Sequence, residues 1–170
     1  WNVSQEDFLK DSETISNLKL HTSYGLTGNS EIDPYKSLAS VSSGTLLLNG
    51  SRSPYSYISS IANPDLKWEK TAQWDLGMSF GVFEDRLNFD VSYYHKKTTN
   101  LLLDCPLPTS SGYSSIYKNI GSVQNQGMDL MVNAIPISTK TGFNWNATLN
   151  LNYNKNKILH LGENDEDIEL

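Results

Sequence analysis

The feature that most constrains this chain is a strict alternation of apolar and polar residues, which recurs in one segment after another. Over residues 143–154, the odd positions hold Phe, Trp, Ala, Leu, Leu and Tyr, and every even position holds Asn or Thr. Residues 72–82 and 87–93 alternate in a similar way. Because successive side chains of a β-strand point to opposite faces, this period of two predicts strands with one apolar and one polar face.

The alternating segments predict five strands, at residues 18–28, 68–82, 86–103, 122–135 and 142–157. Short turns separate the second strand from the third and the fourth from the fifth, whereas long connections rich in Ser, Gly, Pro and Tyr occupy residues 29–67 and 104–121. Connections of this length are unusual in compact soluble domains. An up-and-down membrane barrel has this asymmetry, with its long loops outside the cell. The predicted fold class is therefore all-β, with antiparallel up-and-down strands forming part of a transmembrane β-barrel, and in isolation an open, curved sheet.

Composition and charge exclude several other classes of protein. Only 38% of the 170 residues are apolar, and the chain has no continuous apolar run of the roughly 18 residues that a membrane-spanning helix needs. The net charge is −6 and the basic residues are not clustered, so nucleic acid is not an expected partner. Cys105 is the single cysteine, which leaves no internal disulfide. The chain begins at Trp1 without a leader, so we expect a fragment whose signal peptide lies upstream or has been removed.

Alternation by itself leaves two environments open for the apolar faces. In a soluble sandwich, such as a secreted carbohydrate-binding module, they would pack against a second sheet. In a membrane barrel they would meet lipid, and the Asn-rich face of residues 144–154 would line the lumen. Aromatic residues stand near the strand ends, where a barrel carries its interfacial girdles; they are Trp68, Trp74, Tyr93, Trp145 and Tyr153.

Four segments carry a resemblance to a known family. They are Leu-Lys-Leu-His-Thr-Ser-Tyr-Gly-Leu-Thr-Gly-Asn at residues 18–29, Asn-Pro-Asp-Leu-Lys-Trp-Glu at 63–69, Tyr-Tyr-His-Lys-Lys-Thr-Thr-Asn-Leu-Leu at 93–102, and Asn-Ile-Gly-Ser-Val-Gln-Asn-Gln-Gly-Met-Asp-Leu at 119–130. In order and spacing they resemble the C-terminal barrel region of SusC/RagA-type TonB-linked outer-membrane proteins of Bacteroidetes. His21 stands where a basic residue, often Arg, is usual, and Asp129 where Glu is common.

The resemblance implies a barrel of the outer membrane of a Gram-negative bacterium, closed around an N-terminal plug. It further implies import of glycans or peptides with energy passed from TonB, and a SusD-like surface lipoprotein that caps the barrel. Residues 1–170 would then be a partial barrel domain, with the plug and the segments that contact TonB outside these residues. We therefore expect a transporter wall in contact with outer-membrane lipid, and the soluble carbohydrate-binding module is the alternative.

No arrangement of residues predicts an enzyme, a cofactor site or a metal site. The acidic residues 163–169 lack the spacing of an EF-hand loop. The three histidines, His21, His95 and His160, share no metal-ligand spacing. Paired carboxylates, which glycosidases use, are represented only by Glu84–Asp85 in an expected turn and by Asp75 and Asp90 on polar faces. We expect hydrated surface carboxylates here, not general acids or bases.

Tyrosines in the two long connections are the best candidates for binding. Interleaved with Ser and Gly, they can stack on sugar rings or dock a partner lipoprotein, or they can pack the loops together. The candidate substrate- or partner-contact residues are Tyr35, Tyr55, Tyr57, Tyr113 and Tyr117.

Overall fold

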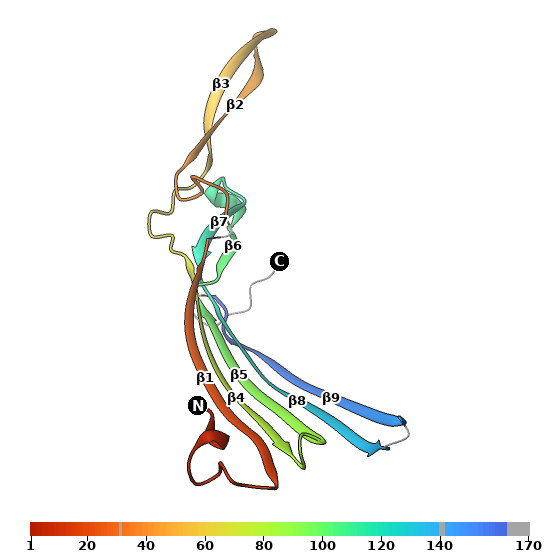
Figure 1. The fold of residues 1–170 in the computed structure, drawn as a ribbon. Helices are drawn as coiled ribbons and strands as arrows, with labels where there is room; N and C mark the ends of the chain where they lie inside the picture. Colours follow the sequence, from red (N-terminus) through yellow and green to blue (C-terminus); the bar gives the residue numbers. More distant parts are fainter. Residues whose placement is uncertain (31, 140–141, 163–170) are drawn as a thin grey trace. The chain divides into compact units, whose positions relative to one another are not determined.

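The computed structural model describes residues 1–30, 32–139 and 142–162. Two short 3-10 turns and nine strands make up this part of the chain (Figure 1). In order they are η1 (Val3–Gln5), β1 (Ile15–Asn29), β2 (Ser40–Leu48), β3 (Ser51–Ser60), β4 (Glu69–Val82), β5 (Leu87–Thr99), β6 (Leu102–Pro106), η2 (Thr109–Ser111), β7 (Ser115–Asn119), β8 (Ser122–Ser138) and β9 (Asn144–His160). No helix in the described ranges is long and apolar enough to cross a membrane.

The long strands form one open sheet of five, in the order β1-β4-β5-β8-β9. Strands β1 and β4 run in opposite directions. Thr22 on β1 bonds to Asp75, whereas Asn29, further along β1, bonds to Glu69, which comes earlier in β4. The neighbours are therefore antiparallel, and each sheet strand lies beside the next sheet strand in the chain. The other four strands form two separate hairpins, β2-β3 and β6-β7. The expected antiparallel up-and-down arrangement and the open sheet are confirmed.

Contacts divide the chain into two units, and the long strands contribute to both. The first comprises Trp1–Leu26, Ala72–Lys97 and Gln124–Lys157. The second comprises Thr27–Thr71, Thr98–Val123 and the chain from Ile158. Both short-turn ends of the sheet lie in the first unit, and both inserted hairpins lie in the second.

The long connection over residues 29–67 is not irregular throughout, because β2 and β3 form a hairpin inside it. Leu48 pairs with Ser51, which leaves Asn49 and Gly50 as a two-residue turn. Both turn residues have positive φ, 50° and 79°. Asn-Gly is the dipeptide that favours such a turn, because both residues tolerate the left-handed conformation. The dipeptide was therefore a signal in the sequence for a hairpin that we did not predict.

Several other strand boundaries differ from the expected ones: β1 begins at Ile15, β9 continues to His160, and two further differences have an identifiable cause. The strand expected over 86–103 ends at Thr99, since Asn100 takes a φ of 59°, and the chain pairs again only in β6. The connection expected over 104–121 accordingly contains β7, η2 and most of β6. At the opposite end of the sheet, β8 continues through Pro136 to Ser138. There β8 has already passed the start of β5, so it has one neighbouring strand instead of two, a setting that tolerates proline.

Hydrophobic burial is slight in the described part of the chain. Val3 and Val82 are its only buried apolar residues. On β9, Leu149 and Leu151 are each 54% exposed, and Trp145 is 52% exposed. A soluble domain rarely leaves so continuous an apolar surface uncovered. The sheet is thus built as a wall, and its apolar face requires an apolar environment outside these residues.

Gly127 on β8 lies where the backbone leaves no room for a side chain. A Cβ built there would fall 2.6 Å from the carbonyl oxygen of Tyr153 and 2.7 Å from the ring of Tyr94. The Tyr94 ring therefore covers the bare backbone of Gly127. This close approach is the role that glycine within a strand commonly serves.

Gly127→Ala is expected to destabilise the sheet by about 1–2 kcal/mol, because the added methyl must push apart two strand neighbours. The measurement is the urea midpoint of the full-length protein folded in lipid vesicles. Gly25→Ala is the matched control, since its Cβ would meet nothing within 4 Å. Equal shifts for both variants would contradict the steric role of Gly127.

Candidate functional site

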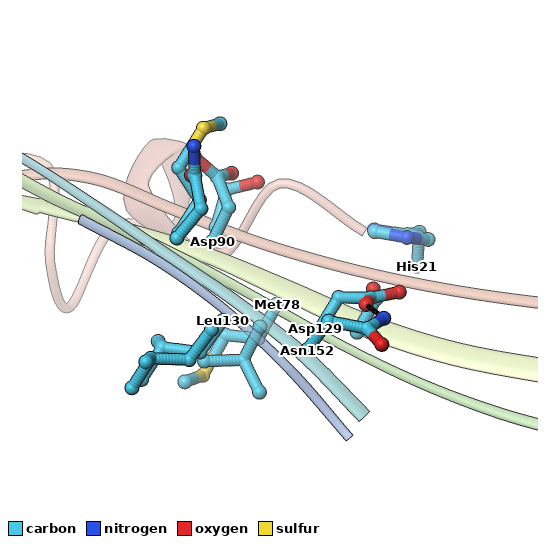
Figure 2. A pocket seen from close by; sticks show the side chains of 12 residues that line it. His21, Met78, Asp90, Asp129, Leu130 and Asn152 are labelled. Atoms are coloured by element: carbon cyan, nitrogen blue, oxygen red, sulfur yellow. Dashed lines mark hydrogen bonds between the residues drawn. The ribbon is translucent and has the colours of Figure 1, made fainter. Parts of the chain in front are cut away.

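The polar face of the first unit is lined by residues from β1, β5, β8 and β9. Figure 2 shows His21, Asp90, Asp129 and Asn152 on one side of the strands, and Met78 and Leu130 on the other. The alternation in the sequence thus separates into two chemically different faces, as expected. The hollow that these residues border has a volume of about 500 Å³ and is open to the surroundings.

Cross-strand polar pairs connect β8 to β9 at regular intervals. Asn156 donates to Asn125 at 2.7 Å, and Thr148 donates to Asn133 at 2.9 Å. Between these two pairs, Asn152 donates to Asp129 (Figure 2). The pairs step by four residues along each strand, so every second position on the polar face is bonded across the strands. Directly opposed side chains are the units that stabilise a sheet, and here they hold the Asn-rich face in register.

The carboxylates considered for catalysis lie on the polar face and in the β4–β5 turn. Asp75 accepts hydrogen bonds from Ser23 at 3.0 Å and Gln73 at 2.9 Å, which accounts for both of its oxygens. Asp85 lies in the β4–β5 turn. Among the residues that the structure describes, no group of three or more His, Cys, Asp or Glu side chains is placed to hold a metal ion. The acidic residues 163–169 lie outside the described ranges.

The five candidate tyrosines all belong to the second unit, but they do not form one cluster. Tyr55 and Tyr57 stack on each other on β3, with ring centroids 5.6 Å apart. Tyr117 on β7 contacts Lys36, which lies in the connection between β1 and β2. The Lys36 ammonium is 5.5 Å from the centroid of the Tyr117 ring. The loop neighbour Tyr35 is 80% exposed. Tyr113 follows η2, where its backbone N–H donates to the Ser111 hydroxyl at 3.2 Å.

An anchor network, absent from our sequence predictions, ties the four family-like segments together. The side chain of Asn119 accepts a hydrogen bond from the N–H of Lys67 and donates one to its carbonyl, both at 2.6 Å. It also donates to the carbonyl of Asn100 at 3.0 Å. A carboxamide carries both donors and an acceptor, so Asn119 substitutes for the backbone of a neighbouring strand.

Two further side chains extend this anchor network. Asn63 donates to the carbonyl of Tyr117 at 2.7 Å. Glu69 accepts from the N–H of Leu102 at 2.9 Å and from Asn29 at 3.2 Å. The segment 63–69 is thereby fastened to β1, β6 and β7. Its resemblance to a family motif was the signal available in the sequence, but spacing alone did not indicate which groups it would meet.

An open antiparallel meander with one polar face, one exposed apolar face and almost no internal core defines a class: it is the wall of a membrane β-barrel. Residues 14–168 match the family described as TonB dependent receptor-like, beta-barrel. This chain belongs to that family, which consists of outer-membrane proteins.

Similar proteins agree in sequence and in structure. TonB-dependent receptor P26 of Formosa agariphila is 39% identical, over 95% of this chain and 16% of its own length. TonB-dependent receptor SusC of Bacteroides thetaiotaomicron is 35% identical, over 98% of this chain and 17% of its own. The RagAB peptide importer in its open-open state superposes with a TM-score of 0.81 at 37% identity, over 95% of this chain and 17% of that one.

These comparisons confirm the resemblance to SusC/RagA-type proteins, the barrel fold and the outer-membrane location. They favour the barrel over the soluble carbohydrate-binding module. The chain spans about one sixth of the length of the curated relatives it matches. Its described residues form the five-stranded sheet β1-β4-β5-β8-β9.

Proposed function

We propose that this chain is a wall segment of a TonB-dependent transporter that imports glycans or peptides through the outer membrane. The main support is a single observation: a family-matched sheet that separates an Asn-rich face from an apolar face. On this proposal the apolar face contacts lipid. The Asn-rich face lines the lumen, where carboxamides bond to water, to the plug or to the passing nutrient.

The partners follow from the relatives. A SusD-like surface lipoprotein would cap the barrel, and the TonB complex would act through segments outside these residues. A solved relative is described as a peptide importer, which keeps peptides beside glycans as the substrate class. The long connections that contain β2-β3 and β6-β7 would face the cell exterior, because the turns at the other ends of the strands are short.

The proposed activity is gated passage, without bond chemistry by these residues. Asp75 is occupied by hydrogen bonds, and Asp85 lies in a turn. The five tyrosines, Tyr35, Tyr55, Tyr57, Tyr113 and Tyr117, would contact the nutrient or the capping lipoprotein from the exterior loops.

Uptake by intact cells tests this proposal. Deleting the gene for the full-length protein is expected to abolish uptake of one class of labelled nutrient, either oligosaccharide or oligopeptide, and the wild-type gene is expected to restore it. Collapse of the proton-motive force, which TonB requires, should abolish uptake equally. Undiminished uptake of both nutrient classes after deletion would reject the import function.

A further inference from the structure

The β2-β3 hairpin carries a flat aromatic surface that its own backbone holds in place. Tyr55 on β3 lies directly opposite Gly44 on β2. A Cβ at position 44 would fall 2.6 Å from Cε1 of the Tyr55 ring and 2.8 Å from its hydroxyl. The ring therefore lies flat across the strand in the space that glycine leaves. A ring seated in this way loses less conformational freedom when a ligand binds.

The neighbouring ring extends this surface. Tyr57 stacks beside Tyr55 with centroids 5.6 Å apart and ring planes inclined by 26°. The two residues remain 42% and 48% exposed, even though each ring packs against the other. We call Tyr55, Tyr57 and Gly44 the tyrosine platform. Its two nearly parallel rings overlap in part, and together they present one exposed aromatic surface.

The tyrosine platform shares its face of the hairpin with uncharged residues, which are serines together with Leu46 and Leu48. Ser42 pairs with Tyr57, and Ser53 stands two residues before Tyr55, so both serines share the face of the rings. The hairpin's one charged residue is Arg52. Arg52 lies three positions before Tyr55 on β3, and an odd number of positions along a strand places two side chains on opposite faces. The hairpin itself therefore places no charged residue on the face that carries the rings.

We infer that the tyrosine platform binds a neutral oligosaccharide by stacking a sugar ring on the exposed aromatic surface of Tyr55 and Tyr57. The C–H groups on one face of a pyranose are weakly positive and apolar, and they suit the negative face of an aromatic ring. The hydroxyls of Ser42, Ser53 and the tyrosines match the donors and acceptors at the sugar rim. The inference deepens the proposed import function, on which it rests, by selecting neutral glycans as the substrate class.

Calorimetric titration of the full-length transporter in detergent tests the platform. The probes are neutral hexasaccharides of glucose, mannose and galactose, with an uncharged hexapeptide for comparison. At least one hexasaccharide is expected to bind. Tyr55→Ala/Tyr57→Ala should weaken its binding by about tenfold or more, since each stacked ring contributes about 1 kcal/mol. Tyr55→Phe/Tyr57→Phe keeps both rings and should stay within about threefold of wild type.

Gly44→Ala provides a second variant that keeps both tyrosines. Its methyl would displace the Tyr55 ring. Hexasaccharide binding should therefore weaken, although both tyrosines are still present. Tyr24→Ala is the matched control, because this exposed tyrosine lies on β1, outside the hairpin. It should bind the hexasaccharides as wild type does.

Three outcomes would overturn the inference. They are a wild-type protein that binds none of the hexasaccharides, an alanine double variant that binds them unchanged, and a hexapeptide whose binding depends on the two tyrosines. Uptake by intact cells shows whether only the glycan platform is wrong or whether the proposed import function is wrong as well. A transporter that still imports peptides leaves import standing and rejects only the glycan platform.

Discussion

Leu151→Arg in the full-length protein is expected to lower the free energy of unfolding in a lipid bilayer by about 2–4 kcal/mol, the cost of a lipid-facing arginine near the membrane midplane. Leu151 lies near the middle of β9, and its side chain is 54% exposed on the apolar face. If that face meets lipid, the guanidinium loses water without gaining a partner. The measurement is urea unfolding of protein folded into vesicles, followed by tryptophan fluorescence.

Asn150→Arg is the matched control, one residue away on the polar face of the same strand. In the lumen its guanidinium keeps water, so the folding free energy should change by less than about 1 kcal/mol. The difference between two adjacent positions removes any general effect of arginine on strand formation. Equal costs at both positions, or a larger cost at Asn150, would contradict the assignment of the apolar face to lipid.

Asn119→Ala is expected to loosen the anchor network by about 3 kcal/mol, because three hydrogen bonds of about 1 kcal/mol each disappear together. The groups left without their partner are the N–H and carbonyl of Lys67 and the carbonyl of Asn100. Local opening should become roughly 100-fold more frequent. Amide hydrogen exchange of the full-length protein, read over residues 63–69 and β7, measures this change.

Two further variants give the Asn119 result a graded scale. Asn119→Asp keeps the acceptor for the Lys67 N–H but loses both donated bonds, so its exchange should be intermediate. Asn29→Ala removes one exposed hydrogen bond, to Glu69, and should change exchange by less than about tenfold. Exchange in Asn119→Ala no faster than in Asn29→Ala would show that water replaces the Asn119 carboxamide without loss.

Much of the barrel wall was predictable from sequence, because alternate residues of a strand point to opposite faces and the sequence therefore gives the chemistry of each face. The run of residues 143–154 specifies which side chains share a face, and the paired contacts Asn152–Asp129 and Thr148–Asn133 lie on the polar face so predicted. The Asn49-Gly50 turn was also readable from local chemistry, although we expected an irregular connection there.

The anchor network and the tyrosine platform could not be derived in this way. Asn119 and Lys67 are separated by 52 residues, and no local pattern indicates that a carboxamide will meet a particular backbone. Of the five candidate tyrosines, only Tyr55 and Tyr57 are joined by a ring contact in the described part of the chain. That contact depends on the register that places Tyr55 over Gly44.

The sequence by itself determined the period of the strands, the chemistry of their two faces and, through its family-like segments, the kind of barrel to which the wall belongs. These properties are local, since each depends on residues within a few positions of one another. Tertiary structure alone decided which polar groups bond across strands and which aromatic rings gather. Those outcomes depend on register between segments far apart in the chain, and a shift of one residue would turn every side chain to the opposite face.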